Sequence, residues 1–178
     1  IKMNNYLNYI KHSEKKISLY CNQLAINNKF IFYFFRIITI AADWWMYFIY
    51  AIFLLLYIEF NTTKNIIILG SVSFSIHYSV YYLIKNTIKR KRPFDEEKNT
   101  IKCLVKPPDK YSMPSGHSSG ITIITLILIY QLKINIFLFV APFVILSRIF
   151  LGVHYLTDTI IGILLGYISY NLASFIIG

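Results

Sequence analysis

The chain has 178 residues, enough for one domain; 56% of them are hydrophobic and 15% are charged. The mean hydropathy of +0.54 is too high for a soluble domain of this size and indicates an integral membrane protein. The net charge of +10 would suit nucleic acid, but the basic residues stand beside apolar segments and no nucleic-acid-binding motif is present. We therefore expect membrane lipids as partners, and no nucleic acid.

The first 42 residues differ in character from the rest of the chain. Residues 3–28 mix apolar side chains, such as Tyr6 and Leu7, with lysines. This pattern fits either a helix lying on lipid headgroups or a solvated tail. Residues 30–40 are apolar but short and interrupted by Arg36, so we expect them to continue along the membrane surface. The sequence thus predicts an N-terminal amphipathic, interfacial segment over 1–42 and a membrane-embedded domain over 43–178.

Five apolar segments follow, and Trp44 and Trp45 mark the interface where the first begins. The second has 20 residues without Lys, Arg, Asp or Glu, enough to cross a hydrocarbon core of about 30 Å. In the last, Gly162 and Gly166 are spaced for close helix packing within the monomer. We predict an all-α, polytopic membrane helix bundle of about five to six transmembrane helices with an N-terminal interfacial helix. The five segments are residues 44–58, 65–84, 117–132, 134–149 and 155–177.

Three polar islands interrupt these apolar segments. They have the forms K-x6-R-P over residues 85–93, P-S-G-H over 114–117, and S-R-x5-H-x3-D over 147–158. With five spans, all three islands fall on the same side of the membrane. Charged groups are costly in a bilayer, so their presence here indicates a functional site.

The residue types in the islands suit an anionic phosphate. Lys85 and Arg92 are seven apart, so on one helix they would face the same way. Arg148 adds a planar cation whose donors match two phosphate oxygens. Ser115 and Gly116 lie where a helix is expected to begin, and free backbone N–H groups there favour an anion.

A histidine and an aspartate complete the third island. His154 and Asp158 are spaced i, i+4, which on a helix would stack the carboxylate against the imidazole. A carboxylate in that position fixes the tautomer and orientation of a histidine nucleophile or base.

In this order, the three motifs resemble the full signature of the phosphatidic-acid phosphatase type 2 superfamily, which includes lipid phosphate phosphatases and vanadium haloperoxidases. The resemblance runs from about residue 43 to the C-terminus. It implies that His154 attacks phosphorus to form a phosphohistidine, supported by Asp158, and that His117 protonates the leaving oxygen and then activates water. It also implies a metal-independent reaction without a cofactor. The residues expected to bind phosphate are Lys85, Arg92, Ser115, Gly116 and Arg148.

The sequence therefore predicts a membrane enzyme that removes a terminal phosphate from a lipid phosphate or pyrophosphate. The substrates implied by the resemblance are undecaprenyl pyrophosphate, phosphatidylglycerol phosphate, phosphatidic acid and the 1-phosphate of lipid A. The short link between the first two islands favours an open entrance and broad specificity. An alternative is a lipid-phosphate binding or flipping protein without hydrolysis, although such a protein has no need for both histidines. A haloperoxidase is disfavoured because those relatives are generally soluble.

Other polar residues have plainer interpretations. Lys89, Arg90 and Lys91 lie outside the signature, and we expect headgroup contacts or a role in topology. His77 is expected to be a buried packing residue, and Asp43 a helix cap or a support for another site residue. The acidic run over residues 95–97 is expected to be a solvated surface. Cys21 and Cys103 fit no metal spacing, and no pattern supports a disulfide between them.

The charge distribution and the resemblance disagree about orientation. All but two of the 18 Lys and Arg residues lie on the side of the islands, counted with the N-terminal segment; the exceptions are Lys64 and Lys133. The positive-inside rule would place that side in the cytoplasm. Bacterial relatives commonly work on the outer surface of the cytoplasmic membrane. The resemblance therefore implies a multi-pass protein of the bacterial cytoplasmic (inner) membrane with an extracytoplasmic active site.

Overall fold

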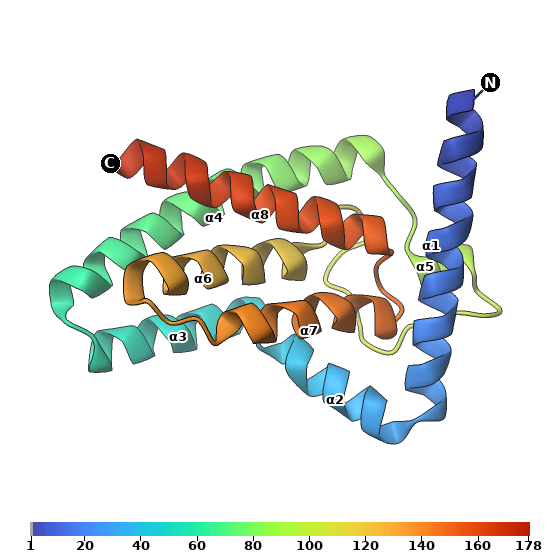
Figure 1. The fold of residues 1–178 in the computed structure, drawn as a ribbon, viewed down its shortest axis with the longest axis horizontal. Helices are drawn as coiled ribbons and strands as arrows, with labels where there is room; N and C mark the ends of the chain where they lie inside the picture. The colour runs from blue at the N-terminus through green and yellow to red at the C-terminus, as the bar shows by residue number, and fades with distance from the viewer. Residues whose placement is uncertain (1) are drawn as a thin grey trace.

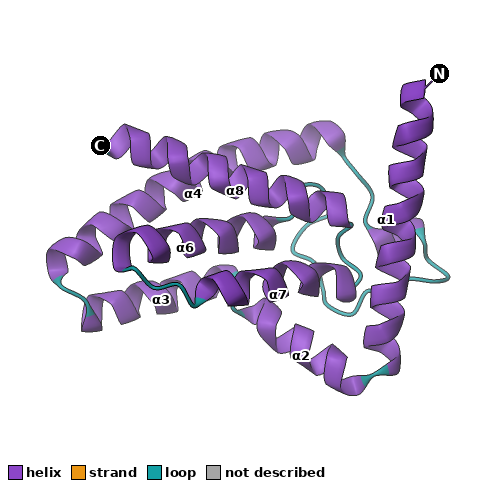
Figure 2. Ribbon diagram, viewed as in Figure 1, coloured by secondary structure: helices purple, strands orange, loops and turns teal. Residues whose placement is uncertain are grey.

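The computed structural model describes the backbone of residues 2–178 and the side chains of residues 8–178. The expected apolar contribution of Tyr6 and Leu7 lies outside the described side chains. The described part consists of helices, turns and loops, which confirms the all-α prediction (Figure 2). The helices are α1 (Lys2–Asn27), α2 (Lys29–Ile40), α3 (Trp44–Tyr57), α4 (Phe60–Ile88), α5 (Pro93–Glu96), α6 (Gly116–Leu132), α7 (Phe137–Phe150) and α8 (Leu156–Ile177).

Five of these helices, α3, α4, α6, α7 and α8, correspond to the five predicted apolar segments. Helix α6 packs against α4, α7 and α8, and α3 diverges from α4 after the short turn that joins them (Figure 1). Helices α4 and α8, with 29 and 22 residues, are long and apolar enough to cross a membrane. Helices α6 and α7 are apolar but have only 17 and 14 residues, short of a typical crossing helix.

Helix α2 differs from the expectation that residues 30–40 continue along the membrane surface. It packs against α7, where the ring centroids of Phe35 and Phe150 lie 4.2 Å apart. Together α2 and α3 are apolar and long enough for a third span, bent by 58° at the break between them. One side of α2, with Phe35 and Thr39, is thus covered by protein, whereas Phe30, Tyr33 and Ile37 are exposed.

Helix α1 lies across the end of the bundle where α7 ends and α8 begins (Figure 1). Its Lys15 ammonium pairs with the carboxylates of Glu96 and Glu97, at 3.0 and 2.6 Å. These carboxylates are therefore joined to α1 rather than forming the solvated surface expected from the sequence. Asn22 adds hydrogen bonds to the backbone of the α5–α6 loop and of α7.

Close packing between α6 and α8 depends on the predicted pair of glycines. A Cβ added at Gly162 would lie 2.5 Å from the carbonyl oxygen of Ser115, and one at Gly166 would lie 2.4 Å from that of Ser119. No side chain fits in such a space, so the two backbones approach only because both residues are glycine. This confirms the predicted role of the glycine pair in packing within the monomer. Both cysteines, Cys21 and Cys103, are free thiols.

Candidate active site

The three polar islands meet at one end of the bundle, next to α1 (Figure 1). Lys85 lies in the last turn of α4, and Arg92 immediately precedes α5. Ser115 caps α6, whose first turn holds Gly116 and His117. The remaining residues follow one another at the junction of two helices: Arg148 in the last turn of α7, His154 in the turn and Asp158 in the first turn of α8.

Lys85 and Arg92 do not share a helix, so that expectation was wrong. Helix α4 ends at Ile88, and Lys89 takes the left-handed conformation with φ of 50°. Pro93 then starts α5. Proline has no backbone N–H to donate, so it would interrupt a continuing helix but fits the first turn of a new one. The two cations still meet, because both bind the carboxylate of Asp109.

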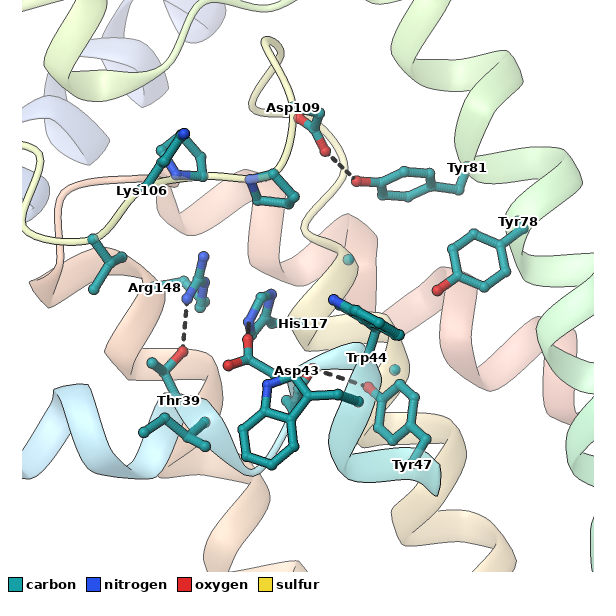
Figure 3. A pocket seen from close by; sticks show the side chains of 18 of the residues that line it. Thr39, Asp43, Trp44, Tyr47, Tyr78, Tyr81, Lys106, Asp109, His117 and Arg148 are labelled. Carbon is teal, nitrogen blue, oxygen red and sulfur yellow. Dashed lines mark hydrogen bonds and ion pairs between the residues drawn. The ribbon is translucent and has the colours of Figure 1, made fainter. Parts of the chain in front are cut away.

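Asp109, in the α5–α6 loop, joins three donors from different parts of the chain. Its carboxylate accepts from the Lys85 ammonium and from Arg92 Nη2 at 2.7 Å. It also accepts from the Tyr81 hydroxyl at 2.8 Å (Figure 3). Burial alone would raise the pKa of Asp109, but Lys85, Tyr81 and Arg92 outweigh it and hold the pKa below its usual value. The two cations that were expected to bind phosphate are therefore bound to a carboxylate of the protein itself.

His154 is held in a turn that brings it back against α7. The backbone N–H groups of Val153 and His154 both donate to the carbonyl of Arg148, at 3.2 Å. The turn needs Gly152, whose φ is +76° and whose missing Cβ would lie 2.4 Å from the carbonyl oxygen of Lys102. The imidazole is 3% exposed, and its Nε2 lies 3.4 Å from Nη1 of Arg92.

The surroundings of His154 favour its neutral form. Burial lowers its pKa well below the usual value, and the nearby cations Arg92 and Arg148 lower it further. A neutral imidazole has a free lone pair on one nitrogen, which a nucleophile needs. The electrostatics of this site therefore suit attack on an electrophile at neutral pH.

Asp158 supports the turn more directly than it supports the histidine. His154 lies outside α8, so the predicted stacking of the pair on one helix was wrong; Nδ1 and Oδ2 are 3.7 Å apart. The carboxylate instead caps the helix by accepting from the Tyr155 N–H at 2.8 Å. It also accepts from Arg90 Nη1 at 2.7 Å.

Arg90 is a residue whose place the sequence did not indicate. It was expected to contact headgroups, yet it pairs with both Asp158 and Glu14 of α1 and lies 4.3 Å over the ring of Tyr155. Its guanidinium thus connects the N-terminal helix with the third motif. The only signal in the sequence was its place inside the basic run that holds Arg92.

His117 and Arg148 are both held by residues near the break between α2 and α3 (Figure 3). His117 Nε2 lies 2.9 Å from the carboxylate of Asp43, and Arg148 Nη1 donates to the hydroxyl of Thr39 at 2.6 Å. Asp43 therefore makes the supporting contact that the sequence left open as an alternative to a helix cap. Thr39 belongs to a segment in which the sequence indicated no site residue.

At the start of α6, Ser115 and Gly116 are engaged with the protein itself. The Ser115 hydroxyl accepts from the Ser118 N–H, and the Ser115 N–H donates to the carbonyl of Asp158 at 3.0 Å. Gly116 lies against Tyr81, 3.3 Å from the position that a Cβ would take. His77, expected to be a buried packing residue, is buried and contacts the Ser119 hydroxyl at 2.6 Å.

A cavity of about 810 Å³ opens beside these residues (Figure 3). Asp43, His117, Arg148 and Asp109 line its polar part. The rest of its wall comes from α2, α3, α4, α6 and the α5–α6 loop; its aromatic residues, from α3 and α4, are Trp44, Trp45, Tyr47, Phe74, Tyr78, Tyr81 and Tyr82. The cavity thus combines an anion-binding wall with an apolar one, as an amphiphilic ligand requires.

Three cations and two histidines gather at one end of an apolar helix bundle, an arrangement that suits a membrane protein acting on an anion such as phosphate. The comparison with protein families agrees, because the model of the PAP2 superfamily matches residues 44–177. The chain therefore belongs to the PAP2 superfamily.

Curated relatives in mycobacteria are phosphatases. Over 100 residues the chain is 32% identical to the decaprenylphosphoryl-5-phosphoribose phosphatase of Mycobacterium tuberculosis, a match that covers 56% of this chain and 54% of that protein. The enzyme of the same name from Mycolicibacterium smegmatis is 31% identical over 93 residues, which cover 52% and 49%. The chain thus spans about half the length of the curated relatives it matches.

Two solved structures share the fold. The LpxE of Aquifex aeolicus matches with a TM-score of 0.72 over 89% of this chain and 92% of that one. The transmembrane PAP2-type phosphatidylglycerolphosphate phosphatase of Bacillus subtilis matches with a TM-score of 0.73 over 94% and 85%. Both are 20% identical to this chain, so the likeness is one of fold.

Proposed function

We propose that this protein is a lipid phosphate phosphatase of a bacterial cytoplasmic membrane that works through a phosphohistidine on His154. The observation that carries the proposal is the setting of that residue: a buried imidazole with Nε2 beside Arg92 and Nδ1 on the side of Asp158. In this orientation the proton belongs on Nδ1, near the carboxylate, and the lone pair on Nε2 faces the cations that would hold phosphate.

The reaction would proceed in two displacements at phosphorus. In the first, Nε2 of His154 forms the N–P bond while the P–O bond to the lipid breaks and His117 gives a proton to the leaving oxygen. In the second, water attacks phosphorus, His117 takes the water proton, and the N–P bond breaks to release phosphate. Lys85, Arg92 and Arg148 would stabilise the charge on the phosphoryl oxygens. Because these cations supply the charge stabilisation, we propose that turnover needs no metal ion.

A second, apolar cavity supports a lipid as the leaving group. It has a volume of about 870 Å³ and lies between α3, α4 and α6. Four residues, Trp44, Tyr47, Phe74 and Tyr78, line both this cavity and the one beside His117. A phosphate at the polar end could therefore carry a hydrocarbon chain into the apolar part.

The candidate lipid substrates are inferred from the family resemblance and from the relatives. The candidates are undecaprenyl pyrophosphate, phosphatidylglycerol phosphate, phosphatidic acid and lipid A 1-phosphate, and the mycobacterial relatives add a decaprenylphosphoryl phosphoribose. These lipids share a terminal phosphate on a hydrocarbon anchor. We propose that the protein accepts several of them, with the active site on the extracytoplasmic side. One lipid turned over at least a hundredfold faster than the others would contradict the broad specificity.

The test is phosphate release by detergent-purified protein against these lipids in the presence of EDTA. We expect the wild type to turn over and His154→Ala to lose activity by at least a thousandfold. His12→Ala, a change at an exposed histidine of α1, is the matched control and should retain activity. Rapid acid-free quenching with ³²P-labelled substrate should trap a phosphoprotein in the wild type but not in His154→Ala.

Other outcomes would point elsewhere. Loss of turnover with EDTA that added metal restores would contradict the metal-independent reaction. Lipid binding without turnover by any folded sample would favour the binding or flipping protein instead. Substantial turnover by His154→Ala would overturn the assignment of the nucleophile.

A further inference from the structure

The break between α2 and α3 is held as a defined bend. The two helices meet at 58°. The backbone carbonyls of Ala41 and Ala42, left without helical partners, accept from the hydroxyls of Tyr50 at 2.9 Å and Tyr47 at 3.2 Å. Ala42 is 4% exposed, so the bend is buried against the bundle. We refer to residues 39–43 as the elbow.

The elbow contacts two of the signature residues, and its geometry is not explained by the helices alone. Asp43 occupies the N-cap position of α3, where an aspartate normally accepts from a backbone N–H of the first turn. Its side chain makes no such bond within the described structure and instead lies 2.9 Å from Nε2 of His117. Thr39 similarly uses its hydroxyl to accept from Arg148 (Figure 3).

We propose that the elbow is a working part of the active site, in which Asp43 positions His117 as the proton donor to the leaving oxygen. This inference rests on the proposed function of His117. The elbow immediately precedes the region that matches the PAP2 superfamily, residues 44–177. Its residues thus lie outside the three signature motifs.

The proton balance follows from which nitrogen Asp43 contacts. To act as the acid, His117 must be an imidazolium; with the Nε2–H donated to the carboxylate, its second proton lies on Nδ1, the nitrogen that Asp43 does not contact. The Nδ1–H bond breaks as the leaving oxygen takes the proton, and the ring stays neutral with its remaining proton on Nε2. In the hydrolysis step, water returns a proton to Nδ1.

A counter-charge is needed at this position because cations surround it. Arg148 lines the same cavity as His117, and a neighbouring cation disfavours a proton on an imidazole. The carboxylate of Asp43 opposes that repulsion and fixes the ring orientation at the same time. The charge and the orienting contact of Asp43 therefore act on the proton donor and not on phosphate binding.

The experiment compares two leaving groups on the same protein sample. A dioctanoyl phosphatidic acid needs its leaving alkoxide protonated, whereas 4-nitrophenyl phosphate releases a stable phenolate without a proton. For Asp43→Asn we expect kcat/KM to fall about 30- to 100-fold with the lipid and less than about threefold with the aryl ester, since a general acid contributes 10²–10⁴-fold. The ratio of the two values does not depend on how much of the sample is folded.

Two variants complete the test. Asp43→Glu, which keeps a carboxylate, should recover at least a third of the lost activity on the lipid. Glu59→Gln is the matched control, because this acid precedes α4 at the other end of α3 and its side chain accepts hydrogen bonds from Asn61 and Thr62. Glu59→Gln should leave kcat/KM unchanged for both substrates.

Three results would overturn the inference: an equal loss on both substrates, no loss on either, or full recovery with Asp43→Asn at higher substrate concentration. The last would mean that Asp43 affects KM alone. Where the wild type cannot use the aryl ester, the recovery with Asp43→Glu and the split between kcat and KM on the lipid decide the question. Failure of the wild type on the lipid would instead contradict the proposed function.

Discussion

At the scale of single residues, two of the three cations of the site share one carboxylate. Asp109 pairs with both Lys85 and Arg92, and Arg92 also donates to the carbonyl of Val153 at 2.8 Å. A phosphate that binds these cations must either displace the carboxylate of Asp109 or share the cations with it. The affinity for phosphate is therefore a difference between two anions competing for the same donors.

Replacing Asp109 with asparagine tests this competition. The variant keeps the size of the side chain but removes the negative charge, so Lys85 and Arg92 should attract a phosphate more strongly. We expect inhibition by inorganic phosphate to tighten about three- to tenfold and the melting temperature to fall. Asp95→Asn, at an exposed acid of α5, is the control and should change neither value. Weaker inhibition by phosphate would show that Asp109 organises the cations instead of competing for them.

The protonation of His154 should also appear in stability. Its pKa is lowered by burial and by neighbouring cations, so in the unfolded chain it takes up a proton that the folded protein refuses. Above the unfolded pKa of about 6.5 both states are neutral and the residue contributes nothing. Below that pH the unfolded state is favoured, by up to about 1.4 kcal/mol for each pH unit until the folded pKa is reached.

We therefore expect the melting temperature in detergent to fall between pH 7 and pH 5, and to fall less in His154→Gln. The glutamine variant has no titrating group at this position. His12→Gln, at an exposed site on α1, should keep the pH dependence of the wild type. An identical slope in the wild type and in His154→Gln would show that other groups cause the acid sensitivity.

At the scale of elements, the sequence predicted the helices better than the contacts between them. Apolar composition and length identify α3, α4, α6, α7 and α8, because a lipid-facing segment must be apolar and a helix satisfies its own backbone hydrogen bonds. The pattern could not reveal that α2 packs on α7, because a covered apolar helix and an interfacial one have similar compositions. The division of the chain at residues 42 and 43 stays a prediction.

The same reasoning applies to the site. The motif residues could be found from spacing, since phosphate chemistry needs cations and histidines that an apolar segment would otherwise exclude. The positions of Asp43, Arg90 and Asp109 could not, because each depends on two elements far apart in the sequence. The i, i+4 spacing of His154 and Asp158 suggested that both lie on one helix. The observed helix, α8, begins at Leu156, two residues after the histidine. Tertiary contacts, not local periodicity, decide such details.

Arg90 makes α1 part of the structural support of the site. It pairs with Glu14 on α1 and with Asp158 on α8, and only 18% of its side chain is exposed. Replacing it with glutamine would leave two largely buried carboxylates without their cation, a change that commonly costs about 3–5 kcal/mol. We expect Arg90→Gln to lower the melting temperature by at least 5 °C and kcat by at least tenfold.

The control for Arg90→Gln is Lys91→Gln, since Lys91 is the neighbouring basic residue and is exposed. Thermal melting in detergent and turnover of phosphatidic acid measure the two effects. Should both variants behave alike, Arg90 would belong with the headgroup contacts that the sequence suggested, and α1 would lie on the bundle without supporting the site.

At the scale of the whole molecule, the two ends of the bundle differ sharply. The end with α1, α5 and the three motifs carries nearly all of the basic residues, while the end with the α3–α4 and α6–α7 turns carries Lys64 and Lys133. Charge alone would direct the motif end to the cytoplasm. Several of those cations are paired with carboxylates within the protein, however, including Lys15, Lys85, Arg90 and Arg92. Paired cations should influence membrane orientation less than the total number of basic residues suggests. The charge distribution is therefore compatible with the extracytoplasmic site that we propose.

The native cysteines allow the orientation to be measured. Cys103 is exposed in the α5–α6 loop at the motif end, and burial of part of its surface raises the pKa of its thiol, so labelling is best done at pH 8 or above. In a Cys21→Ser background, a membrane-impermeant maleimide added to intact bacterial spheroplasts should label Cys103. Asn61→Cys, in a chain with both native cysteines replaced by serine, places a thiol in the exposed first turn of α4, at the other end of the bundle. That thiol should react only after the membrane is permeabilised. The reverse pattern would place the phosphatase site in the cytoplasm, and the uncompensated lysines would then have set the topology after all.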